Sequence, residues 1–313
     1  MRYRWVRNAF RNCGRVPAVA VVAAFLLTAC VASSGTSGTE RKGDCPTAAV
    51  AVVVSVDQWG DIVNQLAGDC GAVTTILKSS SADPHDYEPT PADIAKFTGA
   101  KLVVMNGLDY DPWAAKAVVT LDRKPTVVDA GKVGALHSGD NPHLWYGPGD
   151  VYKLADVVTA KLKLLLPKGA TYFERRRTAW RASMRPYDAE IAKIKRVASG
   201  KTFGATEGIF FSMAKALGLI DKTPTGFATA TANGSDPSPG DLNAFEHALE
   251  NGAVDVLIYN TQTEGAIPAQ VRSTAKAASV PIVKVTESVP PGFSTFEGWQ
   301  VSQLRDLARA LAR

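Results

Sequence analysis

Short apolar runs rich in β-branched residues recur along this chain and alternate with helix-like stretches. The first run, AVAVVVSV at 49–56, is almost continuously apolar, as is typical of a parallel strand buried on both faces. Including it, we expect strands at 49–56, 72–77, 101–106, 125–130, 201–206, 254–260 and 280–285. Helices are expected between or beside them, near 58–67, 91–98, 110–119, 208–217, 241–251, 264–278 and 296–312. This order predicts an α/β fold with parallel sheets.

A long polar stretch separates the first four predicted strands from the last three. Residues 169–199 are mostly polar or charged with a thin apolar stripe, and we expect one long helix there despite Pro186. The predicted fold class is therefore α/β, with two parallel-sheet lobes joined by one long helix and a ligand cleft between the lobes. The expected boundaries are a signal at 1–29, a tether at 30–44, lobes at 45–165 and 200–313, and the linking helix at 166–199.

The first 30 residues have the pattern of an export signal. Five arginines and no acidic residue precede an apolar run at 18–27, which is about half of the ~20 residues needed to cross a bilayer. Small residues then precede Cys30, an arrangement that resembles a bacterial lipobox, in which the cysteine is lipidated. We therefore expect an extracytoplasmic protein anchored to the cell membrane through Cys30, with 31–44 as a flexible tether. A transmembrane helix is the alternative.

The positive net charge of the chain belongs to this signal. The full chain has 35 basic and 30 acidic residues, and loss of the five signal arginines leaves 30 of each. A mature chain with no net charge gives no reason to expect nucleic acid as a partner.

Two cysteines remain for the folded chain once Cys13 is assigned to the signal and Cys30 to the lipid. These are Cys45, before the first predicted strand, and Cys70, after the helix that follows it. In an oxidising compartment we expect them to form a disulfide, which would stabilise the first unit by about 3 kcal/mol. Two free thiols and two thiolate metal ligands are the alternatives.

Four polar side chains stand in loops where ligands of α/β proteins bind, beyond the carboxyl ends of strands. They are His85 in DPHDYEPTP, His143 in NPHLWYGP, Glu207 directly after a strand, and Glu287 in VTESVPPG. Two imidazoles and two carboxylates offer nitrogen and oxygen ligands and offset the charge of a divalent cation. Each has an ordinary alternative: surface or capping histidines, a first-turn helix acid at Glu207 and a solvated loop acid at Glu287.

Neither the other histidines nor any known catalytic motif supplies a further candidate residue for this site. We expect His137 and His247 to take no part in it. The chain contains no HExxH, G-x-S-x-G, P-loop or Rossmann motif, and nothing in it nominates a nucleophile. We therefore expect a protein that is not an enzyme.

On these motifs the chain resembles the metal-binding family of ABC-transporter solute-binding proteins. Members of that family serve zinc and manganese importers, and many are zinc-uptake or adhesin-like lipoproteins. The resemblance covers nearly all of the mature chain. It rests on DPHDYEPTPADI (83–94), NPHLWYGP (141–148), GATEGIFFSMAKALGL (204–219) and the segments 236–263 and 285–307.

The resemblance implies two α/β lobes joined by a long helix, with one metal ion in the cleft as the transported ligand. The first two family ligands fall on His85 and His143. The third, histidine in many zinc-type members and glutamate in manganese-type members, falls on Glu207. The fourth is usually aspartate and falls on Glu287, whose longer arm must fit the same space. A glutamate third ligand favours manganese or iron(II), whereas the intrinsic affinity order favours zinc, so zinc and manganese both stay open.

The predicted function is the capture of an extracytoplasmic divalent metal and its delivery to an ABC-type membrane permease and its ATPase. We expect the protein to be a monomer. Three alternatives remain at this stage: a metal-dependent hydrolase with an open coordination position, a surface adhesin with a structural metal, and a binding protein for an organic or oxyanion ligand.

Overall fold

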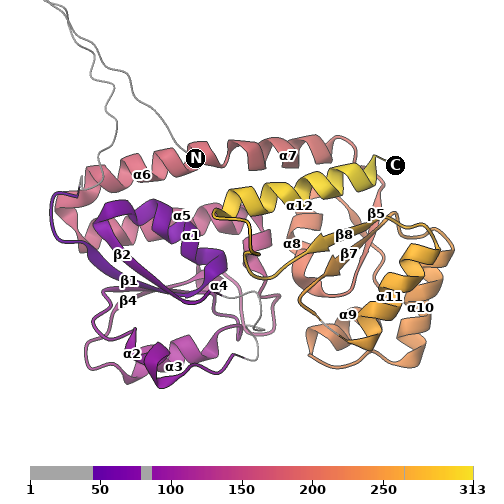
Figure 1. Cartoon of the computed structure of the whole chain (residues 1–313), viewed down its shortest axis with the longest axis horizontal. Coiled ribbons are helices and arrows are strands. Elements are labelled where there is room, and N and C mark those ends of the chain that lie inside the picture. The colour runs from indigo at the N-terminus through magenta and orange to yellow at the C-terminus, as the bar shows by residue number, and fades with distance from the viewer. Residues whose placement is uncertain (1–44, 79–86, 264, 313) are drawn as a thin grey trace, which may run out of the picture. The chain divides into compact units, whose positions relative to one another are not determined.

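Two four-stranded parallel sheets form the framework of the protein (Figure 1). The computed structural model describes residues 45–78, 87–263 and 265–312, which belong to one unit spanning 41–313. The predicted signal at 1–29, Cys30 with its tether, and His85 lie outside the described residues. No helix in the described part of the chain is both long and apolar enough to cross a membrane.

The first sheet has the strand order β2-β1-β3-β4 and pairs Val52 of β1 with Val73 of β2 and Leu102 of β3. Neighbouring residues of β1 face opposite cores, as the continuous apolar run predicts: Val52 and Val54 face α1, and Val53 faces Trp113. The strands are β1 (Val50–Val56), β2 (Gly71–Leu77), β3 (Leu102–Met105) and β4 (Thr126–Asp129). The helices of this lobe are α1 (Asp57–Ala67), η1 (Gly68–Cys70), α2 (Pro91–Ala95), α3 (Pro112–Thr120), α4 (Ala130–Val133), η2 (Leu144–Tyr146), α5 (Pro148–Leu165) and η3 (Pro167–Gly169).

The second sheet repeats this arrangement with the order β6-β5-β7-β8. In β7, Val256 and Ile258 join the large core shared with the first lobe, whereas Leu257 packs with Phe227 and Phe245 on the other face. The strands are β5 (Thr202–Ala205), β6 (Ile220–Asp221), β7 (Val256–Asn260) and β8 (Ile282–Val285). The helices are η4 (Gly208–Phe210), α8 (Phe211–Leu217), α9 (Thr225–Ala232), α10 (Pro239–Glu250), α11 (Ala266–Ala277) and α12 (Phe296–Leu311). The predicted class of two parallel-sheet α/β lobes is confirmed.

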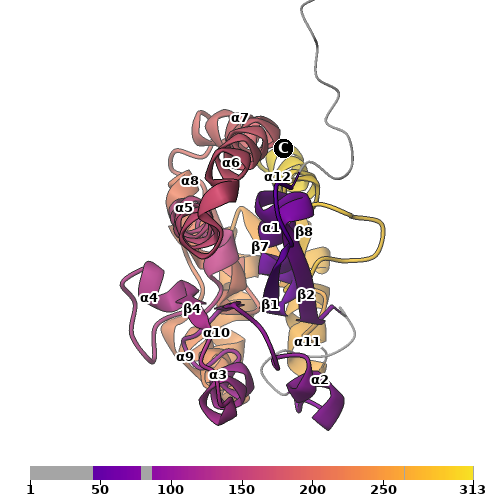
Figure 2. The same cartoon turned by 90° about the vertical axis from the view of Figure 1, so that its left-hand side faces the viewer.

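The linking segment is helical but consists of two helices, α6 (Ala170–Ser183) and α7 (Arg185–Lys195), with Met184 between them. The expectation of one uninterrupted helix is corrected here because Pro186 has no N–H to donate to the carbonyl of the preceding turn. Helical bonding continues on both sides, from Met184 N to Trp180 O at 3.2 Å and from Asp188 N to Met184 O at 3.1 Å. In Figures 1 and 2, α6, α7 and α12 lie together along the upper edge, and one hydrophobic core contains residues of both sheets and all three helices.

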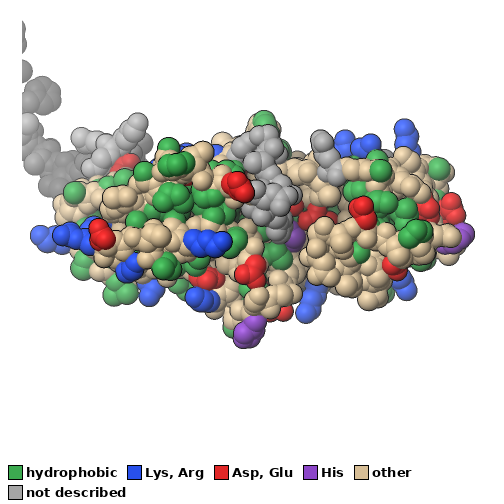
Figure 3. Space-filling view, turned by 90° about the horizontal axis from the view of Figure 1, so that it is seen from below, with side chains coloured by type: hydrophobic (Ala, Val, Ile, Leu, Met, Phe, Trp, Pro, Cys, Tyr) green, Lys and Arg blue, Asp and Glu red, His purple; other side chains and the backbone are tan. Residues whose placement is uncertain are grey.

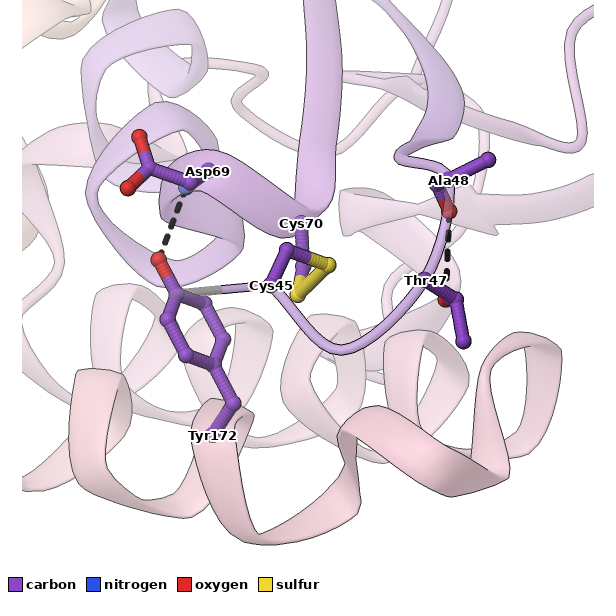
Figure 4. Close-up of a disulfide and its surroundings, with 6 residues drawn as sticks. All are labelled: Cys45, Thr47, Ala48, Asp69, Cys70 and Tyr172. Carbon is purple, nitrogen blue, oxygen red and sulfur yellow. Dashed lines mark hydrogen bonds between the residues drawn. A yellow bond between two sulfur atoms is a disulfide. The ribbon is translucent and has the colours of Figure 1, made fainter. Parts of the chain in front are cut away.

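The predicted disulfide between Cys45 and Cys70 is present, with the two Cα atoms 5.0 Å apart (Figure 4). It ties the start of the described chain to η1, at the end of α1. The neighbouring Asp69 N–H donates a hydrogen bond of 2.7 Å to the Tyr172 hydroxyl of α6. The disulfide and this hydrogen bond together hold Cys45 and the end of α1 beside the linking helices.

Candidate metal centre

Three of the four predicted ligands meet between the lobes. His143 directly precedes η2 in the first lobe, whereas Glu207 follows β5 and Glu287 follows β8 in the second. One ligand atom from each of the three lies within 4.8 Å of those of the other two. The carboxyl ends of β5 and β8 therefore bring two acids to a histidine from the opposite lobe, as expected for an open α/β sheet.

His143 is held in the tautomer that a metal ion requires. Its ring is 6% exposed and lies edge-on to Trp145, with the ring centroids 5.3 Å apart. Its backbone N–H donates to Asn141 Oδ1 at 3.0 Å, and its Nδ1 lies 2.8 Å from the same oxygen. Because that oxygen can only accept, Nδ1 carries a proton, so Nε2 is the nitrogen that the neutral ring would present to a metal ion. Nε2 lies 3.6 Å from Glu207 Oε1 and therefore faces the shared space.

One oxygen of Glu207 is fixed by its own lobe and the other faces His143. Oε2 accepts hydrogen bonds from Asn260 Nδ2 at 2.7 Å and from the Thr263 hydroxyl. Asn260 is the last residue of β7 and is fully buried, so its amide is a rigid donor. The contacts orient the carboxylate with Oε1 toward Nε2 of His143. The Glu207 carboxylate is thus held by the end of β7 and the residues after it, which the alternative of a first-turn helix acid did not foresee.

Glu287 is a buried carboxylate with hydrogen-bond donors from both lobes. It is 3% exposed. Its Oε2 accepts from the Tyr110 hydroxyl of the first lobe at 3.0 Å, and its Oε1 accepts from Asn260 Nδ2 at 3.2 Å. Gln58 Nε2 in turn donates to the Tyr110 hydroxyl at 2.9 Å. A buried carboxylate needs such partners or a cation, and the alternative of a solvated loop acid does not describe this residue.

The electrostatics of the group favour a cation. Two carboxylates converge in a buried region, and Nε2 of the His143 imidazole faces one of them at 3.6 Å. A divalent ion among these atoms would offset the two negative charges and use the nitrogen and oxygen ligands that zinc, manganese and iron(II) accept. By contrast, the side chains of His137 and His247 are 89% and 70% exposed and pair with nearby Asp140 and Glu250.

Comparison with known proteins agrees with this fold and with the class of protein that the loop motifs predicted. The sequence model of the ZnuA family, described as zinc-uptake complex component A, periplasmic, matches residues 52–310. The chain belongs to the ZnuA family. Membership confirms the class that the loop motifs predicted, the substrate-binding proteins of metal-importing ABC transporters.

Relatives in the ZnuA family carry the names of different metals. The iron-binding protein YfeA of Yersinia pestis is 29% identical over 66% of this chain and 67% of its own length. The high-affinity zinc uptake protein ZnuA of Bacillus subtilis is 28% identical over 64% of this chain and 67% of its own. The manganese-binding lipoprotein MntA of Halalkalibacterium halodurans is 28% identical over 50% of this chain and 51% of its own.

Solved structures share the fold of this ZnuA-family chain. The solute-binding protein FpvC of Pseudomonas aeruginosa, in complex with Mn²⁺, superposes with a TM-score of 0.70 at 19% identity, covering 84% of this chain and 98% of FpvC. A Mn-bound periplasmic metal-binding protein of Candidatus Liberibacter asiaticus gives 0.69 at 18% identity, covering 84% of this chain and 99% of its own. At these identities the likeness concerns the fold.

Proposed function

We propose that this protein captures one divalent transition-metal ion between its lobes and delivers it to an ABC-type membrane permease driven by a cytoplasmic ATPase. The observation that carries the proposal is the convergence of His143, Glu207 and Glu287 from two lobes to within 4.8 Å in a ZnuA-family fold. A site split between lobes binds its ion by bringing the lobes together, and it releases the ion when they separate.

The proposed ligand set is His85, His143, Glu207 and Glu287. Nε2 of His143 and Oε1 of Glu207 are the atoms available to the ion, because their companion atoms are engaged by Asn141 and Asn260. His85 is proposed from its Asp-Pro-His motif alone, as the second ligand from the first lobe.

The proposed cargo is zinc or manganese. Relatives of similar identity are named for iron, zinc and manganese, so relatedness alone leaves the metal open. Two imidazoles and two carboxylates suit all three ions. The glutamate at 207 makes the set harder and more favourable to manganese or iron(II), whereas the intrinsic order places zinc above both.

We propose a carrier that is not an enzyme, because four protein ligands would enclose the ion. A catalytic metal site keeps a position for water, whereas a carrier encloses its ion with protein ligands. We further propose that the protein is monomeric and is anchored to the outer side of the cell membrane by a lipid on Cys30. The lipobox pattern and the name lipoprotein given to MntA support the anchor.

The experiment measures the metal content of the purified mature protein and then titrates the metal-stripped protein with zinc and with manganese by calorimetry. We expect one ion per chain, reversible rebinding and an apoprotein that keeps its circular dichroism spectrum. Absence of binding to the stripped protein would contradict the proposal. Unfolding on chelation would instead indicate a structural metal, and hydrolysis of model esters or peptides by the loaded protein would indicate an enzyme.

A further inference from the structure

The positive charge of the mature chain is concentrated in one segment. Residues 161–201 contain 12 lysines and arginines but only 3 acidic residues, although basic and acidic residues balance over the mature chain as a whole. This segment comprises the end of α5, both linking helices and the approach to β5. The remainder of the mature chain therefore carries a matching surplus of negative charge.

Several of these cations project from one side of the linking helices. Arg175, Arg185 and Arg196 are exposed and stand ten and eleven residues apart, so at 3.6 residues per turn they lie within about a quarter turn of one another. Among the residues that the structure describes, no carboxylate forms an ion pair with any of the three. We call this set, with the neighbouring Arg181, the basic face.

A hollow of about 480 Å³ lies along the basic face. It is lined by Arg177, Thr178, Arg181, Ala182, Arg185 and Asp188. The guanidinium groups of Arg177 and Arg181 lie over the rings of Trp180 and Tyr152, at 4.9 and 4.4 Å from the ring centroids. They also pair with Asp156 and Asp188 at 2.6 Å. Two arginines are thus held in place beside a third, Arg185, that has no such acid, which is a suitable arrangement for a phosphate group.

The chain enters the fold next to this face. The described residues begin at Cys45, which is bonded to Cys70. Asp69 N–H then donates to Tyr172 in α6 (Figure 4). Arg176 Nε of α6 also donates to Gln65 O at 2.8 Å. The tether predicted from the composition of 31–44 would, for a chain of small polar residues, have an end-to-end distance of about 20 Å. A lipid on Cys30 would therefore keep α6 close to the bilayer.

We propose that the basic face of α6 and α7 docks on the anionic phospholipid headgroups of the membrane that anchors the protein. The proposal rests on the proposed lipid anchor but not on metal binding. A plane of phosphates can contact guanidinium groups that project from one side of two consecutive helices, and the attraction acts within a screening length of about 8–10 Å. Because α6 and α7 occupy the upper edge in Figures 1 and 2, docking turns the opposite side to solution. Figure 3 shows acidic and histidine side chains near the middle of that opposite side.

The test uses residues 31–313, which lack the lipid but retain the whole compact unit of 41–313 with its cores. The protein is floated with vesicles of phosphatidylcholine alone or mixed with phosphatidylglycerol. We expect binding only to the anionic vesicles, and loss of binding at about 1 M salt, where the screening length is about 3 Å. The variant Arg175→Gln, Arg185→Gln, Arg196→Gln should bind them roughly tenfold or more weakly.

The matched control, Lys116→Gln, Lys222→Gln, Lys276→Gln, removes the same charge from exposed positions elsewhere and should lose less than about threefold. Equal losses in both variants, equal binding to neutral vesicles, or no binding to anionic vesicles would overturn the proposal. Binding to soluble polyphosphate without binding to vesicles would assign the face to another polyanion and overturn it as well. Zinc titration of the arginine variant should be unchanged, so failure of metal binding remains distinguishable from failure of docking.

Discussion

The hydroxyl of Tyr110, in the first lobe, donates a hydrogen bond of 3.0 Å to Oε2 of Glu287, in the second. Both side chains are buried, and Gln58 donates to the same hydroxyl from α1. The bond crosses between the lobes at a proposed ligand. It therefore couples the orientation of the Glu287 carboxylate to the relative placement of the two lobes.

Replacing Tyr110 with phenylalanine tests that coupling. The Tyr110→Phe variant keeps the ring and removes the hydroxyl, leaving one oxygen of Glu287 without this donor. Loss of a group that orients a metal ligand should weaken metal affinity roughly 10- to 100-fold while the apoprotein stays folded. Calorimetric titration, with Tyr152→Phe as the matched control, checks this, because the Tyr152 hydroxyl bonds Asp188 away from the site. Equal affinities in both variants would mean that the bond does not orient the ligand.

The two proposed histidine ligands give the simplest test of the site. His143→Ala and His85→Ala should each abolish stoichiometric binding of zinc and manganese, because each removes a nitrogen ligand. The exposed His137→Ala should bind as the unmodified protein does. Circular dichroism establishes that each variant is folded, and calorimetry measures binding. Unchanged affinity in either ligand variant would remove that histidine from the site.

Metal preference should respond to the residue at 207. Glu207→His replaces a carboxylate oxygen by an imidazole nitrogen, which should shift the ratio of the zinc and manganese dissociation constants toward zinc by tenfold or more. The substitution also removes the acceptor of the Asn260 and Thr263 hydrogen bonds, so both affinities can fall together. The ratio of the two constants is therefore the informative quantity. An unchanged ratio would mean that selectivity is set elsewhere in the site.

The strands were predictable because their physical signal is local. All seven predicted strands correspond to observed strands, since each is a short run that contains apolar or β-branched residues with at least one buried side chain. The two-residue strand β6 was missed because both of its residues are exposed. Helix α9 was missed because Phe227 is its one buried side chain among small residues. Helix α5 was also missed, although Val151, Leu154, Val158 and Leu162 follow helical spacing.

The loops that carry the proposed ligands could be predicted from the sequence, but the side chains that orient those ligands could not. Glu207 and Glu287 stand at strand ends, and a parallel sheet brings such positions together. The side chains that orient them were missed because their bonds span distant parts of the chain, such as Tyr110 to Glu287 over 177 residues. One local feature pointed to Asn260 as a site residue: it is a polar residue at the end of an apolar strand. The hydrogen bond that the His143 ring donates to Asn141 is local, because both residues belong to the NPH motif.

Two further carboxyls lie at the contact between α1 and the segment leading into α12. Burial raises the pKa of Asp57 to about 7, although backbone N–H groups including that of Val289 act in the other direction. Burial also raises the pKa of Asp61, and nearby Glu297 adds to this effect. Asp61 Oδ2 accepts from Phe296 N–H at 2.8 Å, the first residue of α12. Because α1 belongs to the first lobe and α12 to the second, the protonation state of these two carboxyls affects how the lobes pack together.

The stability of the apoprotein should consequently depend on Asp57 and on pH. The folded-state pKa of about 7 lies above the ordinary value of 3.8, so the folded protein holds a proton that the unfolded chain releases. The stabilisation of the folded state by this proton on Asp57 is complete below pH 3.8 and is lost as the pH rises through about 7. Asp57→Asn should thus raise the free energy of unfolding above this range by roughly 1–3 kcal/mol and have little effect at the acidic end. Urea unfolding of the apoprotein at several pH values measures this, with the exposed Asp122→Asn as control. A pH-independent effect, or a loss of stability at alkaline pH, would show that the Asp57 carboxylate is accommodated in its charged form.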